Sequence, residues 1–245
     1  MINEEGSRRE TERRAFPSVF IRKEKMIIRK WRIVVIASLS AILTAIAATV
    51  SPVSLMANTW PFDGMYPDKS THSWCYHSSA GSTLRSYIPG AMNYLYNSTT
   101  IPGIPQHATC DTQNSNQDGD PATDVVWRQG NLNGQFGTAP CFVETASNST
   151  HCDQRQITIG VNNIENSDYP HQQYIKTVCH ELGHTAGFDH YAGFANPPAI
   201  PPAIPPGGVL DCMVSGDVKY ASNPTGSWIW QYNSHHLSHA NSWWP

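Results

Sequence analysis

The segment His180–His190, which reads HELGHTAGFDH, places three histidines and a glutamate within eleven positions. In a helix, residues four apart lie on one face, so His180 and His184 can direct their imidazoles at one metal ion. Gly187 stands where a left-handed glycine ends a helix and turns the chain back, which lets His190 approach as a third ligand. The segment therefore predicts a helix followed by a chain reversal, with three imidazoles meeting at one point.

These residue types indicate a catalytic zinc site. Zinc accepts neutral imidazole nitrogens, and a catalytic site uses three protein ligands and keeps one position open for water. Glu181 lies about 100° round the helix from His180, close enough to reach such a water without being a ligand. A chain of this composition contains HExxH by chance about once in sixty. With Gly187 and His190 included, that falls to about one in twenty thousand.

The segment resembles the HExxHxxGxxH signature of the metzincin clan of zinc metalloproteases. That clan has a methionine turn beneath the metal, and LDCMVSG (210–216) places Met213 at the corresponding position. The resemblance covers about Tyr174 to Val214. It implies an α+β fold with a twisted mixed β-sheet and two long helices in an upper subdomain, about 58–187. A lower subdomain, about 188–245, would hold the methionine turn and a final helix, with the zinc cleft between the two.

The resemblance also implies a role for each residue of the motif. Zinc would be bound by His180, His184 and His190. Glu181 would be the general base in the hydrolysis of peptide bonds, and Met213 a hydrophobic floor rather than a ligand. The alternative is a secreted binding protein that keeps the fold and the zinc without hydrolysing peptides. Glu181 argues against that alternative, because a chain without catalysis has no need of a base beside the metal.

In the metzincin clan an edge strand before the metal helix pairs with the extended substrate. The best candidate here is 155–163, where three apolar residues alternate with smaller ones: Ile157, Ile159 and Val161. Ser215 stands where astacin-like and serralysin-like members have a tyrosine, so the chain looks more like the matrixin, snapalysin or reprolysin branches. Snapalysin-like members have an aspartate at the place of His190, and the subfamily stays open.

Residues 1–57 read as a leader. They hold ten of the sixteen Lys and Arg and five of the nineteen Asp and Glu. A basic segment precedes an apolar run, 33–50, and Ala57 is a plausible cleavage point, which is the layout of a secretory signal. An earlier cut near Ala47 competes. We expect a signal peptide over about 26–57, with 1–25 as an extension before the true start. The alternative is an uncleaved run 33–50 that anchors the protein in a membrane.

The remaining residues, 58–245, carry a formal net charge of −8. Nucleic acids and anionic membranes are bound by basic surfaces, so this balance argues against both as partners. The length fits one domain. We expect a secreted monomer that acts on a protein or peptide.

All six cysteines follow the leader, and an even count in an exported chain predicts disulfide bonds. Six cysteines allow fifteen connectivities, and the sequence alone does not choose among them. Cys141–Cys152 is a plausible local pair around a short loop. The metzincin resemblance brings the residues beside His180 and Met213 together, which implies Cys179–Cys212 and leaves Cys75–Cys110. In the alternative, Cys75 is a latency thiol on the zinc.

Three further segments have two interpretations each. NSNQDGD (114–120) resembles the start of a calcium loop, but Val125 replaces the final glutamate, so a polar turn is favoured and Ca²⁺ stays unsupported. The Pro-Pro-Ala-Ile repeat within 196–208 predicts an extended loop that shapes substrate access or is only a spacer. The histidines near the C-terminus form either a polar helix face or a second metal site: His235, His236 and His239.

Apolar spacing elsewhere predicts a helix from Ser79 to about Tyr96, which Pro89 and Gly90 break or kink. The same reasoning predicts strands at 124–128, 135–144 and 155–163, a metal-bearing helix within 171–188 and a final helix within 226–244.

Overall fold

The structure is a computed structural model, and it describes residues 60–111, 123–145, 148–190, 210–221 and 223–244. All of them belong to Val50–Pro245, one of the two units into which the chain divides. The leader, the calcium-like segment 114–120 and the Pro-Pro-Ala-Ile segment 196–208 lie outside the described residues.

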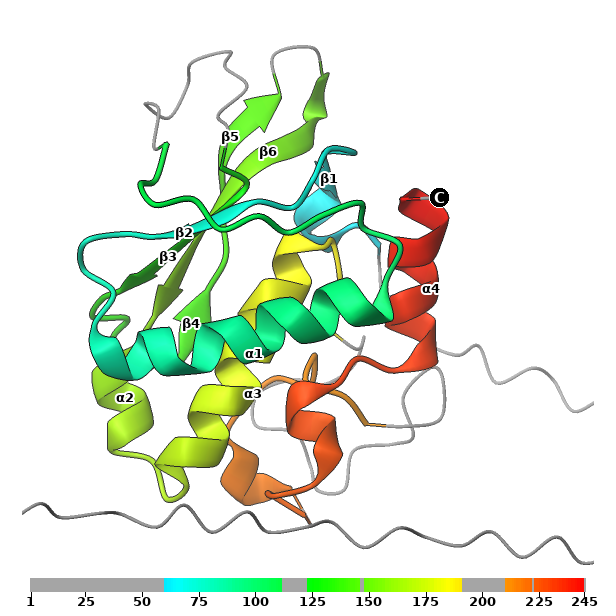
Figure 1. Cartoon of the computed structure of the whole chain (residues 1–245). Coiled ribbons are helices and arrows are strands. Elements are labelled where there is room, and N and C mark those ends of the chain that lie inside the picture. The colour runs from blue at the N-terminus through cyan, green and yellow to red at the C-terminus, as the bar shows by residue number, and fades with distance from the viewer. Residues whose placement is uncertain (1–59, 112–122, 146–147, 191–209, 222, 245) are drawn as a thin grey trace, which may run out of the picture. The chain divides into compact units, whose positions relative to one another are not determined.

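In the described part of the chain, six strands form one mixed sheet (Figure 1). Four are parallel, in the order β1 (Tyr66–Pro67), β6 (Asn148–Ile159), β3 (Val125–Gln129) and β2 (Trp74–Tyr76). Two more pair with β6 in the antiparallel sense: β4 (Gly137–Thr138) and β5 (Cys141–Thr145). The long strand β6 therefore pairs with β1, β3, β4 and β5.

The predicted edge strand 155–163 is wrong in position and in extent. Ile159 pairs with Gln129 of β3 on one side and with Gly137 of β4 on the other, so β6 lies inside the sheet. Ile157 and Ile159 are fully buried. Val161 does not belong to the strand but begins a short helix, α2 (Val161–Glu165). The alternation that predicted a half-exposed edge instead belongs to a strand with neighbours on both sides.

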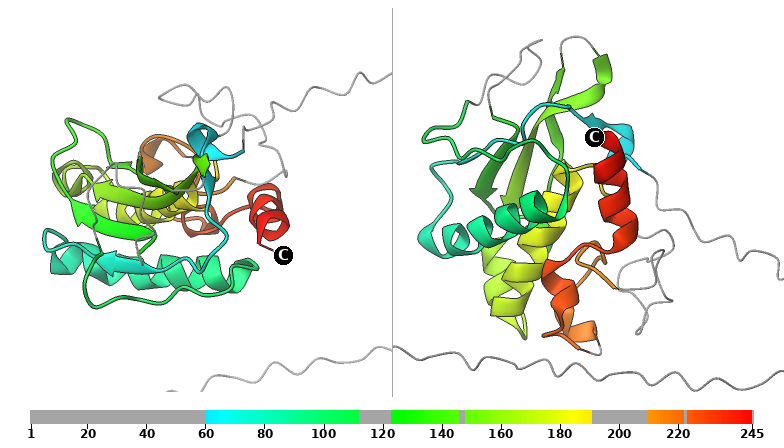
Figure 2. Two further views of the ribbon diagram at one scale, coloured as in Figure 1. Left: turned by 90° about the horizontal axis from the view of Figure 1, so that it is seen from above. Right: turned by 45° about the vertical axis from the view of Figure 1, so that its right-hand side comes forward.

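Two long helices, α1 (Ser82–Ser98) and α3 (Pro170–Thr185), pack against each other beside the sheet (Figure 2). They share one apolar core with the sheet, and its fully buried members include Leu84, Ile88, Met92, Leu95, Leu182, Trp127, Ile157 and Ile159. The last helix, α4 (Ser234–Trp243), lies at the C-terminal end of α1 (Figure 2). Three short 3-10 helices complete the described elements: η1 (Phe62–Gly64), η2 (Val218–Tyr220) and η3 (Ser227–Trp230).

Helix α1 runs through Pro89, where the sequence predicted a break or a kink, and it is not broken there. Proline has no N–H, so the carbonyl of Arg85 loses the helical hydrogen bond from position 89. The Tyr76 hydroxyl donates to that carbonyl at 3.3 Å. Pro89 also lies on the exposed face, away from the buried Leu84 and Ile88. A substitute donor and an exposed ring allow the helix to continue.

Three disulfide bonds join Cys75–Cys110, Cys141–Cys152 and Cys179–Cys212, which are the local pair and the two pairs that the metzincin resemblance implied. The alternative role of Cys75 as a latency thiol is therefore contradicted. Three disulfides are consistent with an extracellular protein, because they persist in oxidising compartments.

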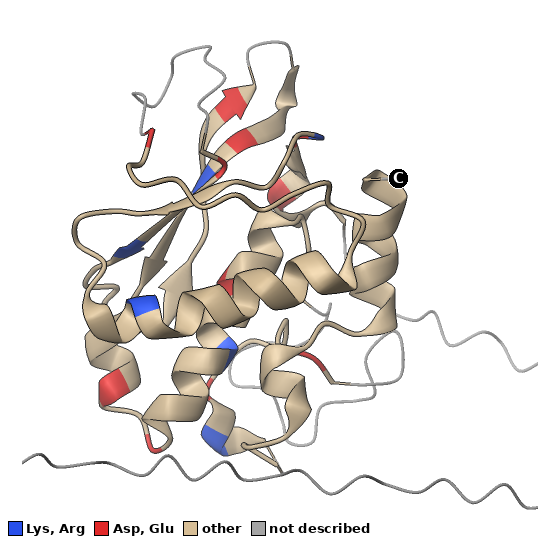
Figure 3. Cartoon of the chain, in the orientation of Figure 1, with Lys and Arg blue, Asp and Glu red and all other residues tan. Residues whose placement is uncertain are grey.

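No helix among the described residues has both the length and the apolar character needed to cross a membrane. Figure 3 shows that, in the view it gives, Lys and Arg are few and are spread over helices, strands and loops.

His72 ties the sheet side of the core to the end of α3. Thr185 Oγ1 donates to the Leu182 carbonyl, so His72 Nε2–H donates to Thr185 Oγ1, at 2.8 Å. His72 Nδ1 is buried and has no hydrogen-bond partner among the described residues. Burial, with a smaller effect of Arg155, lowers the pKa of His72 from 6.5 to about 4.

This pKa predicts a loss of stability in acid. Between pH 6.5 and about 4 the unfolded chain binds a proton at His72 that the folded chain does not, so the free energy of unfolding falls as pH falls. His72→Gln removes this dependence. When the pH is lowered from 7 to 5, the free energy of unfolding should fall by about 2 kcal/mol less in the variant than in the parent. Urea unfolding at the two pH values measures the difference. Equal losses in the two proteins would show that His72 does not carry the effect.

Candidate metal centre

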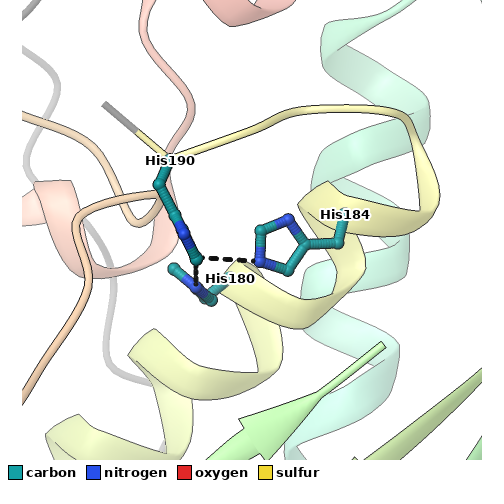
Figure 4. Close-up of side chains that lie close together, drawn as sticks. All are labelled: His180, His184 and His190. Carbon is teal, nitrogen blue, oxygen red and sulfur yellow. Dashed lines mark hydrogen bonds between the residues drawn. The ribbon is translucent and has the colours of Figure 1, made fainter. Parts of the chain in front are cut away.

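Three imidazoles meet beside α3 (Figure 4). His180 and His184 project from successive turns of the helix, and His190 comes from the segment that follows it. Nε2 of His190 lies 2.8 Å from Nε2 of His180 and 3.1 Å from Nε2 of His184. The three residues that the sequence predicted as ligands are thus brought together.

The chain reversal that delivers His190 depends on Gly187. Its φ of +84° lies in the left-handed region, which side chains disfavour. The Phe188 N–H donates to the Gly183 carbonyl at 2.9 Å, and the Gly187 N–H donates to the His184 carbonyl at 3.1 Å. This pair of bonds is the Schellman motif, which ends α3 and sends the chain back towards the helix. The predicted C-cap glycine is confirmed.

Backbone carbonyls fix the tautomers of two of these histidines. Nδ1 of His180 donates to the Cys212 carbonyl at 2.7 Å, and Nδ1 of His184 donates to the Phe188 carbonyl at 2.8 Å. A carbonyl oxygen only accepts, so each Nδ1 carries the proton and each Nε2 presents a lone pair. Burial lowers the pKa of His180 and His184 well below 6.5, and it also lowers that of His190. The neutral form that binds metals is therefore favoured.

The donor set fits a transition-metal ion. Lone pairs that face each other at about 3 Å repel unless a proton or a cation lies between them, and a proton on His190 Nε2 can serve only one neighbour. In a tetrahedral site with Zn–N bonds of about 2.0–2.1 Å, two ligand nitrogens lie about 3.3–3.4 Å apart. The observed separations of 2.8 and 3.1 Å are slightly shorter than this. The three nitrogens are therefore close enough together to bind one small metal cation.

Glu181 lies in the same cleft, which has a volume of about 1080 Å³. Its side chain packs against Gly137 of β4, where even a Cβ atom would overlap the carboxyl group. The residue is 5% exposed, and burial raises the pKa of its carboxyl to about 8, opposed by the nearby Lys176. A bound dication would act in the opposite direction and favour the carboxylate.

Met213 lies beneath the helix that carries the histidines. Its side chain is fully buried, and a Cβ on Gly183 would overlap its Sδ atom and lie 2.9 Å from Cε1 of Tyr232. The neighbouring Cys212 is bonded to Cys179 and its carbonyl accepts from His180. Gly183 is therefore the residue that lets this turn approach α3 closely.

We expect Gly183→Ala to destabilise the protein by about 1–3 kcal/mol, because the extra methyl must push Met213 and Tyr232 aside. Gly90→Ala in α1 is the matched control, since nothing lies within 4 Å of its added Cβ. A helical glycine with open space should gain about 0.4–1 kcal/mol on the same change. Urea unfolding of both variants measures the contrast. An unchanged free energy of unfolding in Gly183→Ala would contradict the close packing.

Sequence reasoning missed the pair that supports this turn. His236 is fully buried, which corrects its prediction as part of a polar helix face, and its Nδ1 lies 2.5 Å from Oδ2 of Asp211. Asp211 also accepts hydrogen bonds from the N–H groups of Met213 and Asn233 at 2.9 and 2.8 Å. Nε2 of His236 lies 3.2 Å from the carbonyl of Asp189, the residue before His190. The only sequence signal was an aspartate two positions before Met213.

Two other groups of metal-ligating types occur among the described residues. His235 and His239 on α4 bring their Nε2 atoms to 3.3 Å, but they belong to no group of three metal-ligating side chains among the described residues. Asp68, Asp124 and Asp153 have carboxylate oxygens within 4.8 Å of one another. Burial, with the charges of Asp68 and Asp153, raises the pKa of Asp124 to about 8.

Comparisons with known proteins identify no family. No family model matches the sequence, and no curated protein matches it. Four chains of known structure match, among them a structure of myroilysin. That chain is 13% identical, with 75% of this chain and 97% of that chain covered and a TM-score of 0.41. A likeness at this identity and TM-score assigns neither a family nor a function to this chain.

Proposed function

We propose that this protein is a secreted zinc-dependent endopeptidase of metzincin type. The observation that carries the proposal is the meeting of three Nε2 atoms, two of them with their Nδ1 protons held by backbone carbonyls. Two further residues of the motif support the proposal, because Glu181 lines the same cleft and Met213 packs against Gly183 of α3. The proposal includes an upper subdomain that ends near residue 187, a lower subdomain after it, and cleavage of the leader 1–57 on export.

Each residue of the centre has a defined task in this proposal. Zinc would be held by His180, His184 and His190, and when bound it supplies a Lewis acid that activates water and polarises a carbonyl. Glu181 accepts a proton from the attacking water and passes it to the leaving amine. Its burial against Gly137 leaves the carboxyl few alternative positions. The buried histidines stay neutral and keep their orientation through the carbonyls of Cys212 and Phe188.

We further propose that the substrate binds along β4 rather than β6. Gly137 and Thr138 pair with β6 on one side and line the cleft on the other. An extended peptide can add to a sheet edge of this kind through main-chain hydrogen bonds. Gly137 brings that edge next to Glu181.

The test is hydrolysis of a broad peptide library by the purified protein, with products identified by mass spectrometry. We expect internal cleavage that a chelator abolishes and added zinc restores. Bound zinc without cleavage would favour the alternative, a binding protein of the same fold. Cleavage that persists in chelator would exclude the metal mechanism.

A further inference from the structure

Lys176 is a buried cation in the wall of the cleft. It lies on α3, one turn before His180, and lines the cleft with Glu181 and with the segment 215–217. The residue is only 4% exposed. A lysine is almost never buried to this degree without an ion partner, because removing an ammonium from water is costly.

The described residues give Lys176 little direct compensation. Its Nζ donates one hydrogen bond, to the Gly216 carbonyl at 3.3 Å, and it forms no ion pair among the described residues. An ammonium has three N–H donors, so two are not used by these residues. Burial is the main cause that lowers the pKa of Lys176 to about 8, which leaves it mostly protonated at pH 7.

The carboxylates near Lys176 already have other partners. Asp211 is held by His236 and by the N–H of Met213. Asp217 accepts from the Lys219 N–H and pairs with Lys219 Nζ at 3.8 Å. Glu181 is the proposed base of the reaction. They raise the pKa of Lys176 from a distance, but none contacts its ammonium.

We infer that Lys176 receives a carboxylate of the substrate, so that the enzyme prefers an aspartate, a glutamate or a chain-terminal carboxylate beside the scissile bond. This inference rests on the proposed peptidase function. Such a carboxylate would supply the missing ion pair at a lysine that is only 4% exposed, where weak screening makes a charged hydrogen bond strong. Specificity follows because a neutral side chain would leave the buried ammonium unpaired.

The test compares matched peptides that differ only in Glu or Gln at the two residues flanking the cleaved bond. A second pair differs in a free or amidated C-terminus at the same place, which distinguishes the two sources of the carboxylate. For the parent we expect kcat/KM to favour the carboxylate by about 10- to 100-fold in at least one pair. Lys176→Met should reduce that ratio to about one. Lys219 is an exposed lysine that lines the same cleft, so Lys219→Met is the control and should preserve the ratio.

Binding separates this inference from the peptidase proposal. Peptides with a reduced, non-hydrolysable bond are titrated into the same three proteins, so affinity is measured whether or not turnover occurs. Tighter binding of the Glu peptide to the parent and to Lys219→Met, but not to Lys176→Met, would support the role of Lys176. Equal affinities for Glu and Gln peptides, and for free and amidated ends, in the parent would overturn it. That comparison uses the parent alone, so it can contradict the inference even if Lys176→Met fails to fold.

Discussion

Replacing Glu181 with glutamine is expected to lower kcat for peptide hydrolysis by about 10²–10⁴-fold, because glutamine cannot accept the proton of the attacking water. The two side chains have nearly the same shape, so the packing against Gly137 should survive. The variant should still bind metal, since Glu181 is not one of the proposed ligands, which are the three histidines. Steady-state kinetics and metal analysis on the same preparation measure both quantities.

Glu144→Gln is the matched control for this prediction. Glu144 is exposed on β5 and does not line the cleft. Its replacement should leave kcat unchanged. A Glu181→Gln protein that keeps the parent's kcat would remove Glu181 from the mechanism, even if the peptidase activity itself were established.

Replacing His184 with alanine should lower the affinity for zinc by more than about 100-fold, because changes to residues that only orient a ligand already cost about 10- to 100-fold. The parent should gain about 2.7 kcal/mol of stability at a free zinc concentration of 100 times its Kd. The variant should gain almost none at the same concentration. Zinc titration followed by thermal unfolding measures both effects.

The control is His171→Ala, on the first turn of the same helix. His171 is exposed, lies nine positions before His180, and its Nδ1 forms a 3.0 Å hydrogen bond with the Tyr87 hydroxyl. Its loss should leave the response to zinc unchanged. Equal zinc stabilisation of the parent and of His184→Ala would mean that the metal binds elsewhere.

The local parts of the site were predictable because helical geometry determines them. Residues four apart share a helix face, and a glycine after the second histidine indicates where the helix ends. The position of β6 was not predictable from alternation. Ile157 and Ile159 would show the same pattern at an edge or inside a sheet, and the neighbouring strands decide between the two.

Contacts over long sequence separations account for what the sequence left out. Lys176 is seen as a cleft residue only when the segment 215–217 is placed against α3. The burial of His236 depends on Asp211, which lies 25 positions away in the chain. Helix α1 passes Pro89 because Tyr76, on a strand, supplies a donor to Arg85. None of these partners leaves a periodic signal.

X-ray absorption at the zinc edge of the purified protein is the most direct test of the central claim. The account predicts one zinc per chain, with three imidazole nitrogens at about 2.0–2.1 Å and one oxygen ligand from water. Removal of His190 should reduce the imidazole count to two. A protein that takes up no zinc, or a spectrum with fewer than three imidazoles in the parent, would contradict it.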